Sequence, residues 1–336
     1  MGSLVRGLVA GMLLLLMLGV APVFSGSWSA RPARGEEPKR CPAGQVLLDG
    51  EHCCWPRQEW SAADKRCTGA PRCPSGMLAV GRACKRPPKI ETDGVRKEDS
   101  AGRSYIYVEG GDFMMGSAQE KGRKIERPRR KVEVRGFFIG EHEVTVAEYE
   151  ACVKAEECPA PDEGERCNWG RPDRDLHPVN CLSWHEARAY CEWAGARLCS
   201  EAEREYAARS RGREQDYPWG DDRATCRRAV MMDGGAGCGE DRTWPVCSKP
   251  LGFSAQGVCD LAGNVWEWTE DDWHGNYEGA PSDGRAWVDD PRPPLRAIRG
   301  GSFLLLGPHV RASYRLAGVA ARAYDHTGVR CCRDEF

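Results

Sequence analysis

The stretch GVCDLAGNVWEWTEDDW, residues 257–273, is rich in glycine, tryptophan and aspartate and follows neither a helical nor a strand period. Two similar irregular stretches precede it, YPWGDD at 217–222 and TWPVCSKPLGFSAQG at 243–257. Long irregular segments in a compact domain need something that fixes them. Disulfides, buried tryptophans and a bound cation are the candidates for these three stretches.

Regular elements are expected upstream of these stretches. SYIYVEGGDFMMG (104–116) predicts a strand followed by a glycine turn, and KVEVRGFFIGEHEVT (131–145) alternates as strands do. Capping boxes, in which Ser or Thr precedes Glu by three residues, predict three helix starts. The boxes are Thr145 with Glu148, Ser183 with Glu186, and Ser200 with Glu203. In the second helix His185 lies off the apolar stripe, so we expect it at the surface.

The order of the sequence blocks resembles the formylglycine-generating enzyme (sulfatase-modifying factor) family. The blocks are VEGGDFMMGS, FFIGEHEVTVAEYEACV, HPVNCLSWHEARAYCEWAGARLCSEAEREYAAR, YPWGDD, GVCDLAGNVWEWTEDDW, RAIRGGSF and GVRCC. They extend over nearly all of residues 104–336. The resemblance implies an α+β fold that is distantly related to C-type lectins and low in regular secondary structure.

The resemblance also implies a structural calcium site in DLAGNVWE. Its ligands would be the carboxylates of Asp260 and Glu267 and the carbonyls of Gly263 and Val265. Hard oxygen ligands in an irregular loop suit calcium. The alternative is a loop held by hydrogen bonds and tryptophan packing alone.

Members of the family can hold a second calcium after the PWG block. Here TCRRAVMMDGGAGCGED, residues 225–241, is rearranged relative to that pattern. We therefore expect the second site to be absent, with a Cys226–Cys238 disulfide in its place.

Family members that make formylglycine bind copper(I) with two cysteines that follow the Gly-Gly-Ser turn and lie five residues apart. In this chain those places fall on Leu305 and Val310. An aliphatic side chain can neither ionise nor ligate copper, so copper chemistry of the family's kind is not expected. The leucines at 304–306 indicate either a filled-in site or the apolar floor of a pocket.

Three further residues belong to this predicted cleft. Ser302 and Trp266 match positions that line the cleft in the family. His309 is the one local residue that could still ligate a metal, and a single imidazole does not make a site. Cys331 matches a cysteine of the family's terminal block, where the resemblance implies a disulfide, and Cys332 is additional. We do not expect the two to bond to each other, because adjacent cysteines rarely do so without strain. We also do not expect them to form a relocated thiol site.

The N-terminus predicts export. Residues 1–27 have the order of a signal peptide, with one arginine, an apolar run and then small residues. An uncleaved membrane anchor is the alternative, since the run approaches the length that spans a bilayer. Residues 28–40 form a polar spacer.

The 18 cysteines of an exported chain are expected to form disulfides. Residues 41–84 form a predicted module that cross-links would hold, because so short a segment buries little apolar surface. Its cysteines are Cys41, Cys53, Cys54, Cys67, Cys73 and Cys84. Zinc binding is the alternative, although the spacing gives no pair of CxxC halves. Residues 85–103 form a charged linker, and residues 104–336 the main domain.

Two hypotheses follow for function. The first is an exported binding or structural module without catalysis, whose ligand is an unidentified protein, peptide or glycan. The second is an oxidoreductase of the formylglycine-generating or non-haem metal oxygenase type that acts on thiols. The net charge of −2 predicts no general attraction to nucleic acid, and no membrane contact is expected beyond the N-terminal segment.

Overall fold

The computed structural model describes residues 41–336 apart from 42–44, 49–51, 70–77, 81–82 and 86–93. The predicted signal peptide (1–27) and spacer (28–40) lie outside the described residues. Among the described residues, no helix is both long and apolar enough to cross a membrane.

The cysteine-rich segment consists of short antiparallel hairpins. The strands are β1 (Val46–Leu48), β2 (His52–Cys54), β3 (Glu59–Ser61), β4 (Arg66–Thr68), β5 (Leu78–Val80) and β6 (Ala83–Lys85), which pair in sequence order. Disulfides join Cys41 to Cys53 and Cys54 to Cys67. These four sulfurs are bonded in pairs, which confirms disulfides rather than zinc thiolates at these positions. Cys73 and the side chain of Cys84 lie outside the described part.

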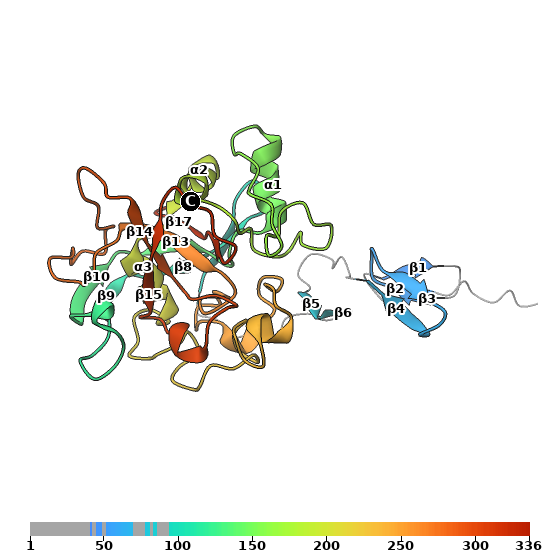
Figure 1. Ribbon diagram of the computed structural model, residues 1–336, viewed down its shortest axis with the longest axis horizontal. Helices are drawn as coiled ribbons and strands as arrows, with labels where there is room; N and C mark the ends of the chain where they lie inside the picture. The colour runs from blue at the N-terminus through green and yellow to red at the C-terminus, as the bar shows by residue number, and fades with distance from the viewer. Residues whose placement is uncertain (1–40, 42–44, 49–51, 70–77, 81–82, 86–93) are drawn as a thin grey trace, which may run out of the picture. The chain divides into compact units, whose positions relative to one another are not determined.

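Three sheets build the main domain (Figure 1). Strands follow the orders β12-β17-β11-β8-β7, β15-β14-β13-β16 and β10-β9. Their bounds are β7 (Arg96–Glu98), β8 (Ser104–Val108), β9 (Gly111–Met115), β10 (Arg130–Val134), β11 (Phe137–Gly140), β12 (Arg197–Leu198), β13 (Trp266–Asp272), β14 (Leu295–Arg299), β15 (Arg315–Val319), β16 (Thr327–Gly328) and β17 (Cys331–Arg333). The predicted linker thus contains a strand, β7, which is exposed and pairs with β8 at the sheet edge.

All three predicted capping boxes are present at helix starts. The helices are α1 (Val146–Lys154), α2 (Trp184–Trp193) and α3 (Glu201–Ala208), with short 3₁₀ helices η1 (Lys124–Glu126), η2 (Ala236–Gly239), η3 (Pro250–Gly252) and η4 (Gly307–His309). Each cap hydroxyl accepts from the N–H of its Glu, and each Glu carboxylate accepts from the cap N–H. His185 is exposed on α2, as predicted.

Disulfides connect elements that are distant in the sequence. Cys331 bonds to Cys191 on α2, and Cys332 bonds to Cys199 just before α3. The predicted Cys226–Cys238 bond is present. The remaining bridges of the main domain that the structure describes are Cys152–Cys158, Cys167–Cys181 and Cys247–Cys259. The two adjacent C-terminal cysteines therefore hold α2 and the start of α3 against β17.

Candidate functional site

Leu305 and Val310, the two positions at which the resemblance predicts the family's copper-binding cysteines, lie around η4. Val310 ends this 3₁₀ helix and is 0% exposed. It belongs to an apolar cluster with Tyr217, Ala224, Ala229, Met231 and Ala262. Leu305 is partly buried and packs against this cluster and against the main core. We call Leu305, Val310 and the residues of this cluster, together with the exposed neighbour Leu306, the aliphatic corner.

The glycine turn before η4 packs directly on Val310. Gly301 has a φ of +75°, and a Cβ built on it would lie 2.7 Å from Val310 Cγ1 and from the His309 carbonyl oxygen. The Leu305 carbonyl accepts a hydrogen bond from Met232 N at 2.8 Å. An aliphatic side chain therefore occupies the space between the turn and η4, and the backbone around it is tied down.

The other predicted cleft residues are not on the surface. Ser302 is 0% and Trp266 1% exposed. His309 is half-buried, with its ring centroid 5.0 Å from that of Tyr314. By contrast, Leu306 is 53% exposed. The structure thus brings Leu305, Val310, Ser302 and His309 into one region but buries most of it.

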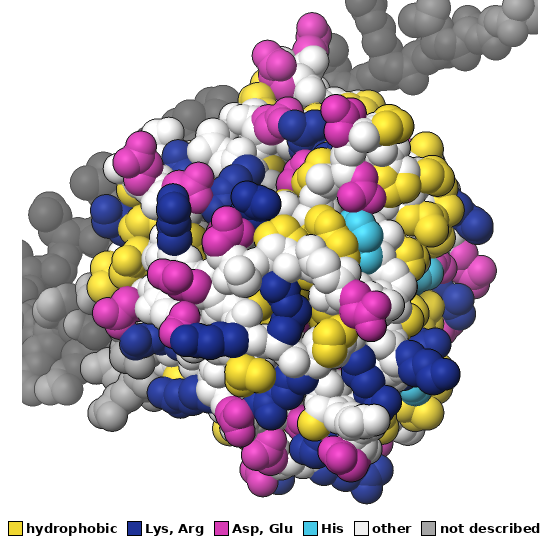
Figure 2. Space-filling view, turned by 90° about the vertical axis from the view of Figure 1, so that its left-hand side faces the viewer, with side chains coloured by type: hydrophobic (Ala, Val, Ile, Leu, Met, Phe, Trp, Pro, Cys, Tyr) yellow, Lys and Arg dark blue, Asp and Glu magenta, His cyan; other side chains and the backbone are white. Residues whose placement is uncertain are grey.

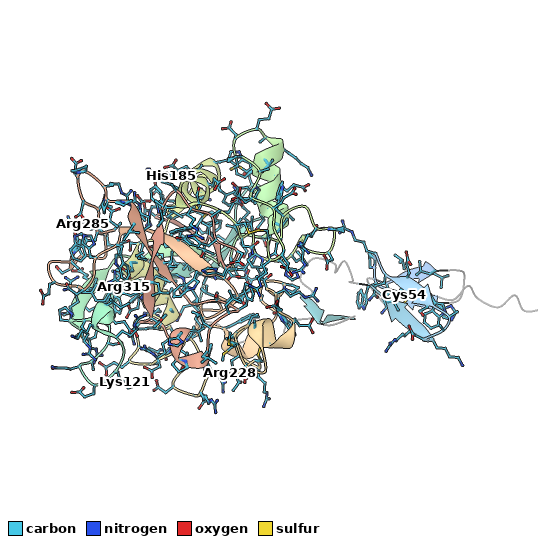
Figure 3. All side chains as sticks on the ribbon, in the orientation of Figure 1. Cys54, Lys121, His185, Arg228, Arg285 and Arg315 are labelled. Atoms are coloured by element: carbon cyan, nitrogen blue, oxygen red, sulfur yellow. A yellow bond between two sulfur atoms is a disulfide. The ribbon has the colours of Figure 1, made fainter. Side chains whose placement is uncertain are left out.

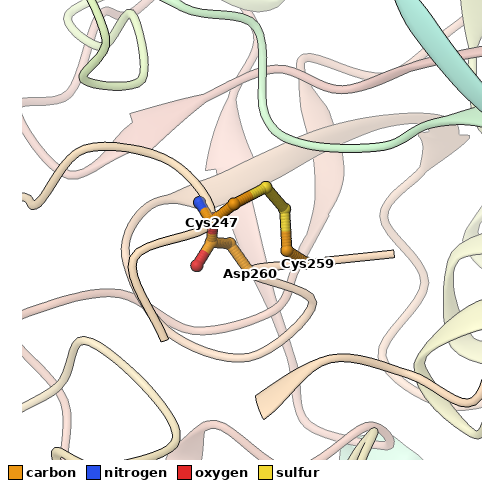
Figure 4. Close-up of side chains that lie close together, drawn as sticks. All are labelled: Cys247, Cys259 and Asp260. Atoms are coloured by element: carbon orange, nitrogen blue, oxygen red, sulfur yellow. A yellow bond between two sulfur atoms is a disulfide. The ribbon is translucent and has the colours of Figure 1, made fainter. Parts of the chain in front are cut away.

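The described part of the chain contains a single group of three or more His, Cys, Asp or Glu side chains whose ligand atoms converge. It consists of Cys247, Cys259 and Asp260 (Figure 4). Its two sulfurs are joined in a disulfide, so they are not thiolate ligands. Asp260, a predicted calcium ligand, accepts a hydrogen bond from Cys247 N at 2.5 Å.

Both oxygens of Glu267, the second predicted carboxylate ligand, accept hydrogen bonds from buried arginines. Arg204 Nε donates to Oε2. Arg330 donates to Oε1 from Nε at 3.0 Å and from Nη2 at 2.8 Å. Although burial acts to raise the pKa of Glu267, the two guanidinium groups hold it below its ordinary value. Calcium at Asp260, Gly263, Val265 and Glu267 stays a prediction of the resemblance, and the partners of Glu267 do not fit it.

Glu143 was missed by the sequence reasoning. It is 0% exposed and accepts hydrogen bonds from Asn264 Nδ2 at 2.6 Å and from Val265 N at 3.0 Å. Burial, followed by the charges of Asp260 and Glu267, raises its pKa well above the ordinary value. Glu143 thus fixes the loop before β13. It lies between strand and helix signals, where no periodicity indicates which side chains are buried.

Helix α3 carries charged residues that are all buried. It packs against β13 and β14 of one sheet and against β9 and β10 of another (Figure 1). Glu201 pairs with Arg315 at 2.6 and 2.8 Å, Glu205 pairs with Arg299, and Arg204 pairs with Glu267. We call these six residues, together with Arg330, the charged centre. Arg315 lies in the interior of the domain in Figure 3, whereas the labelled Arg285 lies at its periphery.

A cavity of about 580 Å³ opens on a different part of the domain. It is lined by the turn 134–136, by α2, β12 and the start of α3, and by the loop 283–286. Its charged residues are largely paired with each other, for example Arg188 with Glu192 at 3.0 Å and Arg197 with Glu203 at 2.7 Å. On the side of β9 and β10, Figure 2 shows basic and acidic side chains interspersed. The wall of the cavity thus combines polar and apolar surface and is nearly balanced in charge.

Comparisons with known proteins agree with this architecture. A protein named Formylglycine-generating enzyme from Streptomyces coelicolor is 32% identical over 69% of this chain and 90% of its own length. One named Inactive C-alpha-formylglycine-generating enzyme 2 from Bos taurus is 28% identical over 68% of this chain and 87% of its length. PvdO from Pseudomonas aeruginosa superposes with a TM-score of 0.63 at 29% identity, covering 72% of this chain and 98% of its own.

A protein named Serine/threonine-protein kinase Pkn1 from Chlamydia trachomatis is 31% identical over 77% of this chain. The chain spans 42% of the length of that relative. The family model described as Sulfatase-modifying factor enzyme 1-like domain matches residues 92–335. The chain therefore belongs to the family of sulfatase-modifying factor enzyme 1-like domains.

Proposed function

We propose that this chain is an exported, non-catalytic binding or structural member of its family. The observation that carries the proposal is the aliphatic corner, in which Leu305 and Val310 occupy the positions of the copper-binding cysteines. Val310 is fully buried and packs on the glycine turn, so neither a thiolate nor free space exists at its position. The cysteines of the described part are all disulfide-bonded, so none of them supplies a replacement thiol.

Export is part of the proposal, and two features support it. The apolar run in residues 1–27 has the order of a signal peptide. The disulfides of the described part would be stable in an oxidising compartment. A precursor of the full sequence, expressed in a secreting host, is expected to lose residues 1–27, which intact-mass measurement of the exported protein checks.

The catalytic alternative is tested directly with a substrate. The purified chain is incubated with a Cys-x-Pro-x-Arg peptide, copper and oxygen, and aldehyde formation is followed by mass spectrometry. We expect no conversion above that in buffer with copper alone. Turnover that depends on the protein would contradict the proposal and favour the oxidoreductase.

A binding module needs a surface, and the 580 Å³ cavity offers one. Because its wall combines polar and apolar surface and its charges are largely paired, it suits a neutral ligand that carries both polar and apolar groups, such as a glycan or an extended peptide segment. Ala286 lines the cavity and is only partly buried, so Ala286→Trp would fill the space without entering the core.

The experiment uses an array of glycans and extended peptides, probed with the wild-type chain and with two variants. Binding is expected to be lost in Ala286→Trp and kept in Leu306→Ser, the matched control at the aliphatic corner. Loss in Leu306→Ser alone would instead place the ligand at the corner.

A further inference from the structure

The resemblance predicts Glu267 as a calcium ligand, but in the structure its carboxylate binds two arginines. Calcium bound through Glu267 would have to share the carboxylate lone pairs with the groups that already donate hydrogen bonds to them. Both oxygens already accept charged hydrogen bonds, from Arg204 and from Arg330. All three side chains are at most 2% exposed, so water does not compete for these bonds.

The same guanidinium groups also bind backbone oxygens near the predicted calcium ligands. Arg204 Nη2 donates to the Leu261 carbonyl at 3.1 Å. Arg330 donates to the Cys259 carbonyl from Nη2 and to the Gly140 carbonyl from Nη1, both at 2.9 Å. Carboxylate and carbonyl oxygens thus converge on two organic cations, in the way that such oxygens converge on a metal ion.

The backbone leaves room for this arrangement. A Cβ built on Gly300 would lie 2.7 Å from Arg204 Nη2, and the φ of Gly300 is +97°. A residue with a side chain at 300 would therefore displace the guanidinium. Position 300 is thus fitted both to the turn and to the arginine that lies over it.

A calcium ion bound through Glu267 would either lie against both guanidinium groups or displace one of them. The displaced group would be left buried without a carboxylate, which is strongly unfavourable. The ion would also lie beside two positive charges in a region that water does not screen. The two guanidinium groups therefore oppose a metal ion at the Glu267 carboxylate.

We propose that Arg204 and Arg330 take the place of a metal ion at Glu267, so that the loop from Asp260 to Glu267 is held without calcium. The guanidinium groups neutralise the carboxylate and cross-link α3, β13 and the segment before β17. This inference concerns the scaffold and is independent of whether the chain binds a ligand or catalyses a reaction.

The first test compares thermal unfolding of the full chain in excess calcium and in EDTA. The expected result is the same Tm in both buffers. A calcium site occupied at a hundred times its Kd would raise Tm by about 5–10 °C. A rise of that size that Glu267→Gln abolishes would overturn the proposal.

Glu205→Gln is the matched control, because Glu205 also lies on α3 and pairs with a buried arginine, Arg299, but is not itself a predicted calcium ligand. Glu267→Gln and Glu205→Gln are each expected to lower Tm by the same amount in calcium as in EDTA. If Glu267→Gln lowers Tm only in calcium, while Glu205→Gln lowers it equally in both buffers, the proposal is wrong.

A measurement on the wild-type chain keeps the proposal testable if the variants do not fold. Terbium(III) serves as the probe, since it occupies calcium sites and emits when a nearby tryptophan is excited. Trp266 and Trp268 flank Glu267 in the sequence. We expect no saturable, tryptophan-sensitised emission that excess calcium removes, and such emission would overturn the proposal.

Discussion

The charged centre and the aliphatic corner lie in the same domain but bury different kinds of side chain, ion pairs in the first and apolar groups in the second. In the charged centre, the buried glutamates at 201, 205 and 267 are matched by arginines. In the aliphatic corner, Leu305 and Val310 pack against apolar side chains without any charge. In the charged centre, a charge that loses its partner stays buried without compensation. In the aliphatic corner, stability comes from apolar surface that is removed from water. A change in the charged centre should therefore cost more than a change of similar size in the corner.

The largest effect is expected for Arg315→Met. It removes the bidentate partner of Glu201 and leaves this buried carboxylate with only Arg299 at 3.6 Å and a hydrogen bond from the Tyr277 hydroxyl, which costs about 3–5 kcal/mol. Urea unfolding followed by tryptophan fluorescence measures the change. The matched control is Arg285→Met, whose exposed pair with Asp283 is 3.6 Å long and should matter by less than about 0.5 kcal/mol. Equal losses in the two variants would remove the distinction between buried and surface pairs.

Val310→Ala should destabilise the corner by about 2 kcal/mol, because two methyl groups are lost and a small cavity remains. Since no charge is involved, the loss should be the same at low and high salt. Urea unfolding at two ionic strengths checks this. A loss that varies strongly with salt would show that the corner depends on the neighbouring charges.

Glu126→Gln tests a charged contact at the border of the corner. Glu126 is fully buried and binds Arg311, the residue after Val310, at 3.0 and 3.1 Å. Burial acts to raise its pKa, but hydrogen bonds from Arg311 and Ser117 lower it below the ordinary value. Its contribution to stability is therefore complete above the pKa of the unfolded chain and is lost as pH falls through the folded-state pKa.

At neutral pH the Glu126→Gln variant should be about 1 kcal/mol less stable than the wild type, since glutamine keeps the shape and one acceptor. In acid its stability should fall less steeply than that of the wild type. Thermal unfolding between neutral pH and pH values below about 4 checks the slope. Parallel curves for the two proteins would mean that Glu126 has an ordinary pKa.

The smallest effect is expected for Leu306→Ser. This side chain is 53% exposed, so its loss should change stability by less than about 0.5 kcal/mol. Thermal unfolding beside Val310→Ala checks the contrast within the corner. A loss as large as that of Val310→Ala would show that Leu306 is covered in solution.

Features that depend on local sequence could be predicted. The capping boxes at Thr145, Ser183 and Ser200 were found because each involves four consecutive residues. The Cys226–Cys238 bond was expected from the family resemblance, because the segment that would hold a second calcium is rearranged here and carries these two cysteines. The family resemblance supplied the α+β fold, which local patterns alone would not have given.

Features that depend on distant partners could not be predicted. In EAEREYAA the number of charges is typical of a helix exposed to solvent. In the structure Arg204 and Glu201 are buried and pair with arginine or glutamate side chains 63 and 114 residues away. Strand β7 was assigned to a linker, because an exposed edge strand is specified by its pairing with β8 and not by its own pattern. The four proposed calcium ligands were inferred without the arginines that contact one of them.

The paired bridges from Cys331 and Cys332 have a consequence for how this domain can vary. They close overlapping loops with sequence separations of 140 and 133 residues, and either bridge alone restricts the unfolded chain by roughly 5 kcal/mol in the chain-entropy model. The irregular stretches 217–222 and 243–257 lie between the bridged cysteines in the sequence. Their sequences can therefore vary or lengthen without freeing the C-terminal strand.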